Sequence, residues 1–367
     1  MQIQKIVVTG GPCAGKTTAM SWIQNALAER GYKVLFVPET ATEFISGGVA
    51  PWTCGTNLDY QLCQMELQIK KEQLFLQAAR TMDAERILIV CDRGAMDNKG
   101  YMTPEEFQEV LRRLNLHEVE LRDGYDGVFH LVTAANGALE AYTTANNQAR
   151  YESAEEAVKL DERLIAAWSG HPHHKIIDNS TTFEGKMHRL LDEITRLIGA
   201  EDLYANERKF LIRYPDVKTL EAMEGSRKVE IFQTYLRTEN GLDTRIRQRG
   251  DQGHYLYYEM TKRMTPDGHQ VETERRLSQD EYLELLMKAD TSRRQIRKTR
   301  YVLSGSSQSI EVDLYPFWDR QAIAKVSMRG DQTKAEFPAC LEVIREVTGE
   351  EAYRNSSMAA KVPEQEV

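Results

Sequence analysis

Short apolar segments alternate with amphipathic segments over roughly the first 200 residues of the chain. The apolar segments are rich in β-branched residues and lie at residues 6–9, 34–37, 87–90, 128–132 and 176–178. The segments between them repeat apolar residues at helical spacing, as in Met20, Ile23 and Leu27, and a long helix is expected from Asp59 to about Arg80. Continuous apolar strands separated by helices are typical of a parallel sheet covered on both faces. The sequence therefore predicts an α/β, doubly wound first domain.

After about residue 200 the strands instead alternate polar and apolar positions. Residues 244–249 place three arginines on one strand face, Glu311 and Asp313 share a face, and Lys298 and Arg300 do the same. For one strand alone, a charged side facing water is the simpler interpretation. Because several strands repeat the pattern, we favour an antiparallel β-barrel, or strongly curved sheet, that gathers these charges inside.

The change of pattern predicts two domains and a tail. We expect a nucleotide-binding α/β domain at residues 1–199 and an antiparallel barrel domain at residues 200–350, which includes a short helix near residues 280–289. Residues 351–367 are polar in composition. They are expected to form a flexible tail.

Composition limits the cellular compartment and the binding partners that can be expected for this protein. The formal net charge of −9 argues against broad neutralisation of a nucleic-acid backbone, so no nucleic-acid partner is expected. The five cysteines are scattered and include no Cys-x-x-Cys pair, which favours a reducing compartment. No apolar run approaches the roughly 20 residues that span a bilayer. We expect a cytoplasmic protein, and peripheral membrane contact stays open.

The segment after the first strand matches the phosphate-binding P-loop pattern Gly-x-x-x-x-Gly-Lys-Thr. In such a loop the backbone N–H groups and the helix N-terminus face phosphate, the lysine adds a positive charge and the threonine hydroxyl can ligate Mg²⁺. The residues expected to contact the nucleotide here are Gly10, Gly11, Cys13, Ala14, Gly15, Lys16, Thr17 and Thr18. The predicted ligands are a nucleoside triphosphate and Mg²⁺.

Two carboxylates follow strands at the edge where the P-loop is expected. Asp92, at the end of the third strand, is a candidate second anchor for Mg²⁺, or alternatively caps a loop. Its neighbour Arg93 would contact phosphate or fix that loop. Glu39 follows the second strand and is a candidate catalytic carboxylate, although a solvated loop glutamate fits the pattern equally well.

Two further residues are weaker candidates. Arg150 precedes a charged helical segment that could form a lid over the phosphates, but a surface arginine is the simpler interpretation. Asp178, at the end of the last strand, could contact the base or serve structurally. Since no Asn-Lys-x-Asp motif occurs, the choice between ATP and GTP stays open.

The first domain resembles a known group of P-loop proteins. Residues 10–18, 38–40, 91–94 and 177–180 together look like the ATPase/kinase domain shared with the ribosylnicotinamide kinase portion of NadR proteins. The resemblance covers roughly residues 1–198.

The second domain resembles the CYTH, or triphosphate tunnel, family. The matching segments lie at residues 207–212, 244–247, 298–301 and 310–314. In that family basic side chains hold a polyphosphate and acidic side chains hold a divalent metal. The resemblance implies that phosphate is bound by Lys209, Arg245, Arg247, Lys262, Lys298 and Arg300. It implies that metal is bound by Glu207, Glu311 and Asp313.

This chain departs from the CYTH signature at three acidic positions. Ala205 stands where the first glutamate of Glu-x-Glu-x-Lys is expected, and Lys325 and Ser327 replace the two acids of the closing strand. Exchanging a glutamate for Lys325 changes the local charge by two units and disfavours a bound dication. We predict a domain that binds a phosphorylated ligand and hydrolyses triphosphate poorly or not at all.

A NadR-like domain followed directly by a CYTH-like domain resembles the TRPL translocation defect protein family. This resemblance implies that the first domain binds GTP and the second binds phosphoinositides. Three hypotheses follow. The first is a nucleotide-binding protein and slow NTPase whose second domain binds a phosphorylated small molecule or phosphoinositide headgroup. The second is an ATP-dependent kinase acting on a nucleoside-like molecule. The third is a metal-dependent triphosphatase.

Overall fold

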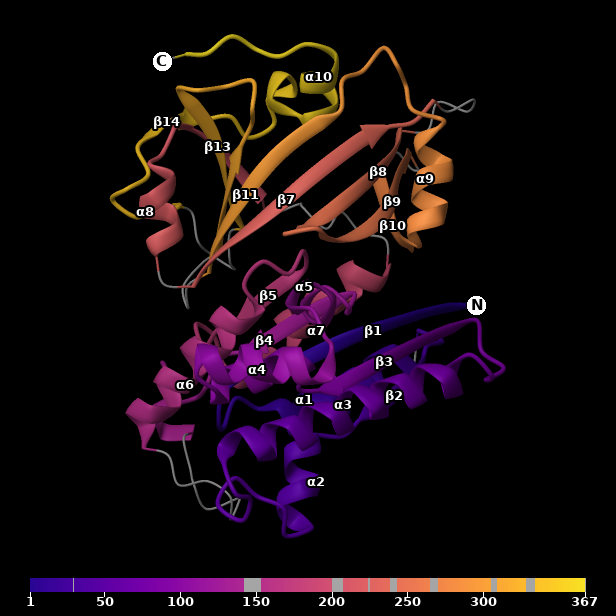
Figure 1. Ribbon diagram of the computed structural model, residues 1–367, viewed down its shortest axis with the longest axis vertical. Helices are drawn as coiled ribbons and strands as arrows, with labels where there is room; N and C mark the ends of the chain where they lie inside the picture. Colours follow the sequence, from indigo (N-terminus) through magenta and orange to yellow (C-terminus); the bar gives the residue numbers. More distant parts are fainter. Residues whose placement is uncertain are drawn as a thin grey trace. The chain divides into compact units, whose positions relative to one another are not determined.

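The computed structural model describes most of the chain in two compact units, Met1–Ile198 and Gly199–Val367 (Figure 1). The described residues are 1–28, 30–141, 153–199, 207–223, 225–237, 243–264, 270–304, 309–327 and 334–366. The division falls where the strand pattern of the sequence changes. Each unit has hydrophobic clusters and a sheet of its own.

The first unit contains a five-stranded sheet in the order β2-β3-β1-β4-β5, with every neighbouring pair parallel. Its strands are β1 (Gln2–Thr9), β2 (Lys33–Val37), β3 (Arg86–Asp92), β4 (Gly127–Leu131) and β5 (His174–Ile177). The five predicted apolar strands are therefore confirmed. In the register, Val8 lies beside Asp92, so the carboxyl ends of β1 and β3 are neighbours.

Helices cover both faces of this sheet, as predicted for a doubly wound fold. They are α1 (Lys16–Ala28), α2 (Thr40–Ser46), α3 (Asn57–Ala79), α4 (Pro104–Leu114), α5 (Glu118–Arg122), α6 (Ala154–Trp168) and α7 (Phe183–Gly199), with 3-10 turns η1 (Ala95–Tyr101) and η2 (Leu139–Ala141). Helices α1 and α7 bury apolar residues such as Ile23 and Leu190 on one face of the sheet. Helices α3 and α4 bury Met65 and Phe107 on the other.

The inner face of α3 is polar over much of its length. The helix begins at Thr56, whose hydroxyl accepts a hydrogen bond from the backbone N–H of Asp59. Its buried residues are Tyr60, Gln61, Gln64, Met65, Gln68, Glu72 and Ala79. Buried polar side chains need hydrogen-bond partners, so this face must meet other polar groups.

The second unit contains a nine-stranded antiparallel sheet in the order β10-β9-β8-β7-β11-β12-β13-β6-β14. The strands are β6 (Glu207–Arg213), β7 (Ser226–Tyr235), β8 (Asp243–Asp251), β9 (His254–Met264), β10 (Gln270–Leu277), β11 (Ile296–Ser304), β12 (Ser309–Leu314), β13 (Gln321–Ser327) and β14 (Val343–Glu346). The predicted antiparallel architecture is confirmed. Over the described residues, the hydrogen-bonded ladder runs from β10 to β14 without joining these two edges.

Short helices and loops cover the apolar face of this sheet and close one end of the opposite face. The helical segments are α8 (Val217–Ala222), α9 (Gln279–Leu286), η3 (Glu351–Tyr353) and α10 (Asn355–Ala360). Leu220 of α8 packs in a cluster with Phe210, Val312 and Ala324. Because residues alternate along each strand, the residues between these apolar ones face the other side of the sheet.

The C-terminal segment differs from the flexible tail expected for residues 351–367. Tyr353 and Met358 are buried in one cluster with Trp318. The Trp318 Nε1–H donates to the Pro363 carbonyl at 3.2 Å. Glu366 forms an ion pair with Arg345 at 2.7 Å. A polar composition misled the prediction, because a few well-placed apolar residues suffice to anchor a segment whose polar groups are paired.

None of the described helices is both long and apolar enough to cross a membrane. The five cysteines are free thiols, in agreement with their scattered positions in the sequence. No disulfide bond between these cysteines therefore stabilises the fold.

Candidate functional site

The P-loop joins β1 to α1 in a backbone conformation that requires glycine at two positions. Gly10 has a φ of +142°, and a Cβ there would lie 2.0 Å from the Leu131 carbonyl oxygen. Gly15 has a φ of +93°, and a Cβ there would lie 2.6 Å from the Phe183 ring. Cys13, between them, also has a positive φ of 56°. This conformation turns the loop just before the N-terminus of α1, the geometry in which backbone N–H groups hold an anion.

Lys16 lies over this loop without a carboxylate partner. Its Nζ donates to the carbonyl oxygens of Gly10 and Gly11 at 3.1 and 3.3 Å. Within the described part of the chain it forms no ion pair with an acid. Burial, with a further contribution from the nearby Arg93 cation, lowers the pKa of Lys16 to about 8. The ammonium is therefore placed where a phosphate would supply its missing counter-charge.

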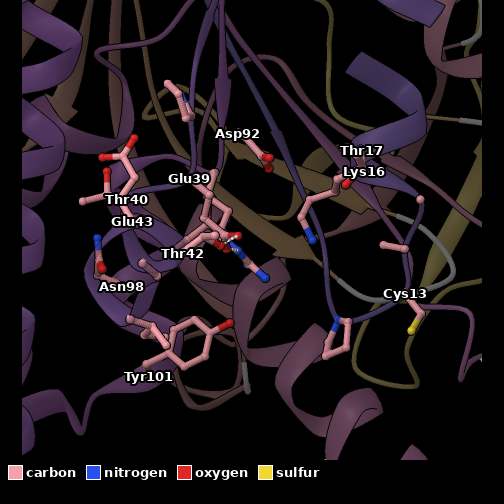
Figure 2. Close-up of a pocket in the computed structure, with 18 of the residues that line it drawn as sticks. Cys13, Lys16, Thr17, Glu39, Thr40, Thr42, Glu43, Asp92, Asn98 and Tyr101 are labelled. Atoms are coloured by element: carbon pink, nitrogen blue, oxygen red, sulfur yellow. Dashed lines mark hydrogen bonds and ion pairs between the residues drawn. The ribbon is translucent and has the colours of Figure 1, made fainter. Parts of the chain in front are cut away.

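A cavity of about 1090 Å³ opens in front of the P-loop (Figure 2). Its walls come from the P-loop, the loop that leads into α2, the polar face of α3, the end of β3, η1 and the start of α7. Small-molecule pockets commonly measure about 300 to 1,000 Å³, so this one has room for a nucleotide and more. The strand order produces it, since the carboxyl ends of neighbouring parallel strands converge there.

Asp92 ends β3 and faces the same space as Lys16 (Figure 2). Its Oδ1 is buried and has no hydrogen-bond partner among the described residues, and burial raises its pKa. A carboxylate oxygen left unpaired suits a hard cation such as Mg²⁺, which binds through one or two protein oxygens with phosphates and waters as its other ligands. Thr17 lines the same cavity at the start of α1 and offers a hydroxyl.

Glu39 also lies in the cavity, where Arg93 holds it. The Arg93 Nε donates to Glu39 Oε1 at 2.5 Å, and the Thr42 hydroxyl donates to Oε2 at 2.7 Å. Burial alone would raise the pKa of Glu39, but the Arg93 and Lys16 cations outweigh it and lower that pKa to about 2. The two sequence candidates are thus brought together as an ion pair, and Glu39 is not the solvated loop residue of the alternative interpretation.

Two residues that sequence reasoning missed support the P-loop from behind. The Lys186 Nζ donates to the carbonyls of Ala14 and Val132 at 3.1 and 2.7 Å. Asp161 accepts from the Gly11 N–H at 2.6 Å and lies 2.9 Å from the buried His130 Nε2. The available signal was a charged residue at a core position, since Asp161 falls among buried apolar residues of α6.

The other two candidates of the first unit lie elsewhere. Asp178 accepts from the Arg189 guanidinium at 2.7 Å and from the Ser180 hydroxyl at 2.6 Å, which indicates a structural role beside the cavity. The neighbouring Asn179 lines the cavity in its place. Arg150 lies outside the described residues. The charged helical segment that follows it is α6, which buries Leu160, Leu164 and Trp168 and lines no part of the cavity.

In the second unit, the strand register puts all the predicted charged residues on one face of the sheet. Residues opposite each other in an antiparallel pair share a face. Lys209 is opposite Lys325, which is opposite Glu311, and Asp313 is opposite Arg300. We call this set the charged face: Glu207, Lys209, Arg245, Arg247, Arg249, Lys262, Lys298, Arg300, Glu311, Asp313 and Lys325.

Acids and bases on the charged face are already paired with each other. Asp313 accepts from Lys298 Nζ at 2.6 Å and from the Arg300 Nε and Nη2 at 2.6 and 2.8 Å. Arg300 also meets Glu311 at 2.5 Å, and Lys325 meets Glu207 at 3.0 Å. Asp313 is fully buried and Lys298 and Arg300 are no more than 9% exposed. The charged face is therefore an interior surface and not the solvated side of a sheet.

Electrostatics within this cluster follow from burial and pairing. The Arg300 and Lys298 cations outweigh burial and hold the pKa of Asp313 well below its usual range. Burial and the Arg300 cation lower the pKa of Lys298 to about 7. Burial and the neighbouring Lys325 likewise lower the pKa of Lys209 to about 8. In the described residues Lys209 has no ion pair, so positive charge is in excess at this corner.

The structure does not assemble the metal-binding carboxylates that the CYTH resemblance implies. Glu207, Glu311 and Asp313 each face a basic side chain. The described part of the chain holds no cluster of three or more His, Cys, Asp or Glu side chains arranged to bind a metal ion. Lys325, which stands in place of an acid, neutralises Glu207, and Arg300 and Lys298 neutralise Glu311 and Asp313.

Comparison with protein-family models gives a match for the P-loop unit. Residues 5–186 match a family model described as an AAA domain. The P-loop unit is thus similar to AAA domains over just under half of the chain, in agreement with its parallel sheet and its P-loop motif.

Two solved structures are similar to parts of the chain. One is the hypothetical protein NE1496, at 24% identity and a TM-score of 0.31, over 43% of this chain and 98% of that one. The other is the inorganic triphosphatase NE1496, at 23% identity and a TM-score of 0.31, over 43% of this chain and 95% of that one. No curated protein sequence matches the chain.

Proposed function

We propose that the first unit binds a Mg²⁺–nucleoside triphosphate, GTP or ATP, and hydrolyses it slowly, while the second unit binds a phosphorylated anion. The observation that carries the first part is Lys16. It is a partly buried ammonium that, among the described residues, is held by loop carbonyl oxygens and by no acid. It lies in front of a glycine-shaped anion loop and lines a cavity large enough for a nucleotide.

Each residue of the P-loop unit has a role in this proposal. Backbone N–H groups of residues 13–17 hold the β- and γ-phosphates, and Lys16 neutralises them. Thr17 and Asp92 would hold Mg²⁺, which would supply positive charge to the phosphates. Water attacks the γ-phosphorus and the nucleoside diphosphate leaves. Glu39, with a pKa of about 2 and bound to Arg93, is a weak base, so fast water activation is not expected.

For the second unit, the charged face supports binding of a phosphorylated ligand without a metal. Its bases outnumber its acids, and arginine and lysine side chains pair phosphate oxygens strongly in a confined site. A phosphoinositide headgroup or a polyphosphate has the required charge. We extend this to a TRPL-like, cytoplasmic protein with peripheral membrane contact. The metal-dependent triphosphatase alternative is disfavoured, because the carboxylates it needs are paired with bases.

The test of the P-loop assignment is Lys16→Ala. Loss of one charge-assisted phosphate contact costs about 1.5 to 3 kcal/mol, so nucleotide affinity should fall roughly 10- to 100-fold. Lys70→Ala, which removes an exposed lysine outside the cavity, is the control and should bind like the wild type. Calorimetry with Mg²⁺ and a non-hydrolysable GTP or ATP analogue measures both. Equal affinity in wild type and Lys16→Ala would refute the assignment.

The test of the charged face is the double variant Arg245→Ala/Arg247→Ala. Its binding of inorganic tripolyphosphate and of soluble inositol trisphosphate should be weaker than that of the wild type at about 50 mM salt, and the difference should shrink at about 300 mM. Arg275→Ala/Arg320→Ala removes two exposed arginines of the same unit and is the matched control. If the first double variant binds both anions as tightly as the control, no anion site lies there.

A further inference from the structure

Side chains from two other segments hold carbonyl groups of the P-loop from behind. The Thr133 hydroxyl, in the loop after β4, donates to the Pro12 carbonyl at 2.5 Å. The Lys186 Nζ, in α7, donates to the Ala14 carbonyl at 3.1 Å. Thr133 is fully buried and Lys186 is 2% exposed. Hydrogen bonds are stronger in such a water-excluded environment, so these two fix the direction in which each carbonyl points.

The direction of a backbone carbonyl sets the direction of the next N–H group. In a planar trans peptide the C=O of one residue and the N–H of the next point to opposite sides, and the described residues contain no cis peptide bond. The Thr133 contact therefore turns the Cys13 N–H away from the back of the loop. The Lys186 contact does the same for the Gly15 N–H. Since Cys13 and Gly15 line the cavity, both donors are turned toward the place where a phosphate would bind.

A carboxylate holds the first turn of the same loop. Asp161 Oδ1 accepts from the Gly11 N–H at 2.6 Å and lies 2.9 Å from His130 Nε2. Asp161 Oδ2 accepts from the Thr133 N–H at 3.3 Å. A Cβ on Gly11 would lie 2.7 Å from Oδ1, so the absence of a side chain lets the carboxylate approach this closely. Asp161 thus joins the start of the loop to the segment that carries Thr133.

Contacts of this kind act on affinity as well as on the fold. A loop whose donors already point toward the ligand loses little conformational freedom when the ligand binds. If the loop adopts other conformations, the affinity falls in proportion to the fraction that can bind. Thr133 separates this effect from direct contact with a ligand, because it is fully buried and does not line the cavity. Lys186 does line the cavity, so its replacement would mix the two effects.

We propose that Thr133, Asp161 and Lys186 are positioning residues that hold the P-loop in its phosphate-binding conformation before a nucleotide arrives. This proposal rests on nucleotide binding at the P-loop, with the N–H groups of Cys13 and Gly15 among the phosphate contacts. It gives α6, α7 and the loop after β4 a part in nucleotide affinity that the P-loop motif itself does not contain.

The experiment is calorimetric titration of the full-length chain with Mg²⁺ and a non-hydrolysable GTP or ATP analogue. Thr133→Val keeps the shape of the side chain and removes the hydroxyl, so the Pro12 carbonyl loses its donor and the Kd should rise about five- to tenfold. Thr133→Ser keeps the hydroxyl and loses a buried methyl group, so it should restore the affinity although it lowers the stability. Affinity that follows stability in these two variants would indicate a purely structural role and refute the proposal.

Tyr32→Phe is the matched control. The Tyr32 hydroxyl, on a residue that is 8% exposed, donates to the Ile198 carbonyl at 3.1 Å. The variant therefore removes a hydroxyl-to-carbonyl hydrogen bond from the same unit but none from the P-loop. It should lower the free energy of unfolding and leave the Kd unchanged.

A second readout needs no ligand. Without nucleotide, amide hydrogen exchange over residues 10–17 should be faster in Thr133→Val and in Asp161→Asn than in Tyr32→Phe, because the loop opens more often. Asp161→Asn has one acceptor oxygen in place of two, so one of its N–H partners is lost. Exchange as slow as in the control would refute the proposal.

The Lys16→Ala variant separates this proposal from the function on which it rests. If Lys16→Ala weakens nucleotide binding but Thr133→Val binds as tightly as Tyr32→Phe, the positioning role is refuted and the proposed function stands. If wild type and Lys16→Ala bind nucleotide equally, both are refuted.

Discussion

We propose that the P-loop cavity and the charged face both bind phosphate, but their charged groups are arranged in opposite ways. In the cavity, the positive potential comes from a backbone loop and from Lys16. Among the described residues, this lysine has no acidic partner and several polar atoms of the cavity have no hydrogen-bond partner. On the charged face, long side chains provide the positive potential, and the buried Lys298 and Arg300 are already paired with Asp313.

This difference decides what each site does without a ligand. The cavity carries unsatisfied groups, so its ligand supplies hydrogen bonds that the protein lacks, and occupancy should stabilise the first unit. On the charged face, Asp313, Lys298 and Arg300 satisfy one another, so their ion pairs contribute to the fold of the second unit. An incoming anion must compete with Asp313 and Glu311 or bind where charge is in excess. Lys325 pairs with Glu207, and the neighbouring Lys209 has no ion pair among the described residues, so these two lysines form such a place.

The largest expected effect is on the structural side of this comparison. Asp313→Ala leaves two buried cations without their shared counter-charge, and breaking a buried ion pair in this way costs about 3 to 5 kcal/mol. We expect the second unit to unfold at clearly lower denaturant concentration, followed through Trp318. Asp319→Ala removes an acid that is 84% exposed and should leave the transition unchanged. A shift no larger than that of this control would mean that the ion pairs do not support the fold.

The next effect concerns pH and the ion pair inside the cavity. Because the pKa of Glu39 is lowered from 4.5 to about 2, its charged form favours folding. That stabilisation is complete above about pH 5 and is lost as the pH falls toward 2. Glu39→Gln should therefore lower the free energy of unfolding of the first unit by on the order of 1 to 3 kcal/mol at pH 7, and by progressively less in acid.

The measurement is the free energy of unfolding of both proteins at several pH values between about 3 and 7. The difference between wild type and Glu39→Gln should narrow as the pH falls. A difference that stays constant with pH would show that the glutamine disturbs packing and that the Arg93 pair contributes no charge-dependent stability.

The elements of the first unit could be predicted because their signals are local. Runs such as Ile87–Val90 are apolar on both faces, and the P-loop pattern lies between a strand and a helix. The contacts of Asp161 and Lys186 could not be predicted in the same way. They reach the loop from helices some 150 residues further along the chain, and a single sequence does not show which core position a charged residue will meet.

For the second unit, the period of two placed each charge on a strand face, and the resemblance to CYTH proteins selected the same residues. Neither the period of two nor the resemblance could predict which charged residues would lie opposite each other on neighbouring strands. That depends on the register between strands far apart in the chain, which places Glu207 near Lys325 and Arg300 beside Asp313. The implied metal ligands therefore lie on one face of the sheet, as the pattern predicted, but their partners there are basic side chains.

The smallest expected effect on stability is at Asp92. We compare this carboxylate of the cavity with Asp313, the buried carboxylate of the charged face. Its Oδ1 has no partner among the described residues, and burial raises its pKa, so its charge is unfavourable for folding at neutral pH. Asp92→Asn should change the free energy of unfolding of the first unit by less than about 1 kcal/mol, in the stabilising direction. Denaturant unfolding without added metal or nucleotide measures this.

The same variant should lose the advantage that Mg²⁺ gives to nucleotide binding, since an amide is a weaker ligand for a hard cation than a carboxylate. Titrating the nucleotide analogue with Mg²⁺ and with EDTA separates the two effects, and Asp83→Asn, in the loop before β3, is the matched control. A stability loss as large as that of Asp313→Ala would make Asp92 a structural residue. The contrast between an unsatisfied cavity and a self-paired face would then not hold, because both units would use their buried carboxylates in the same way.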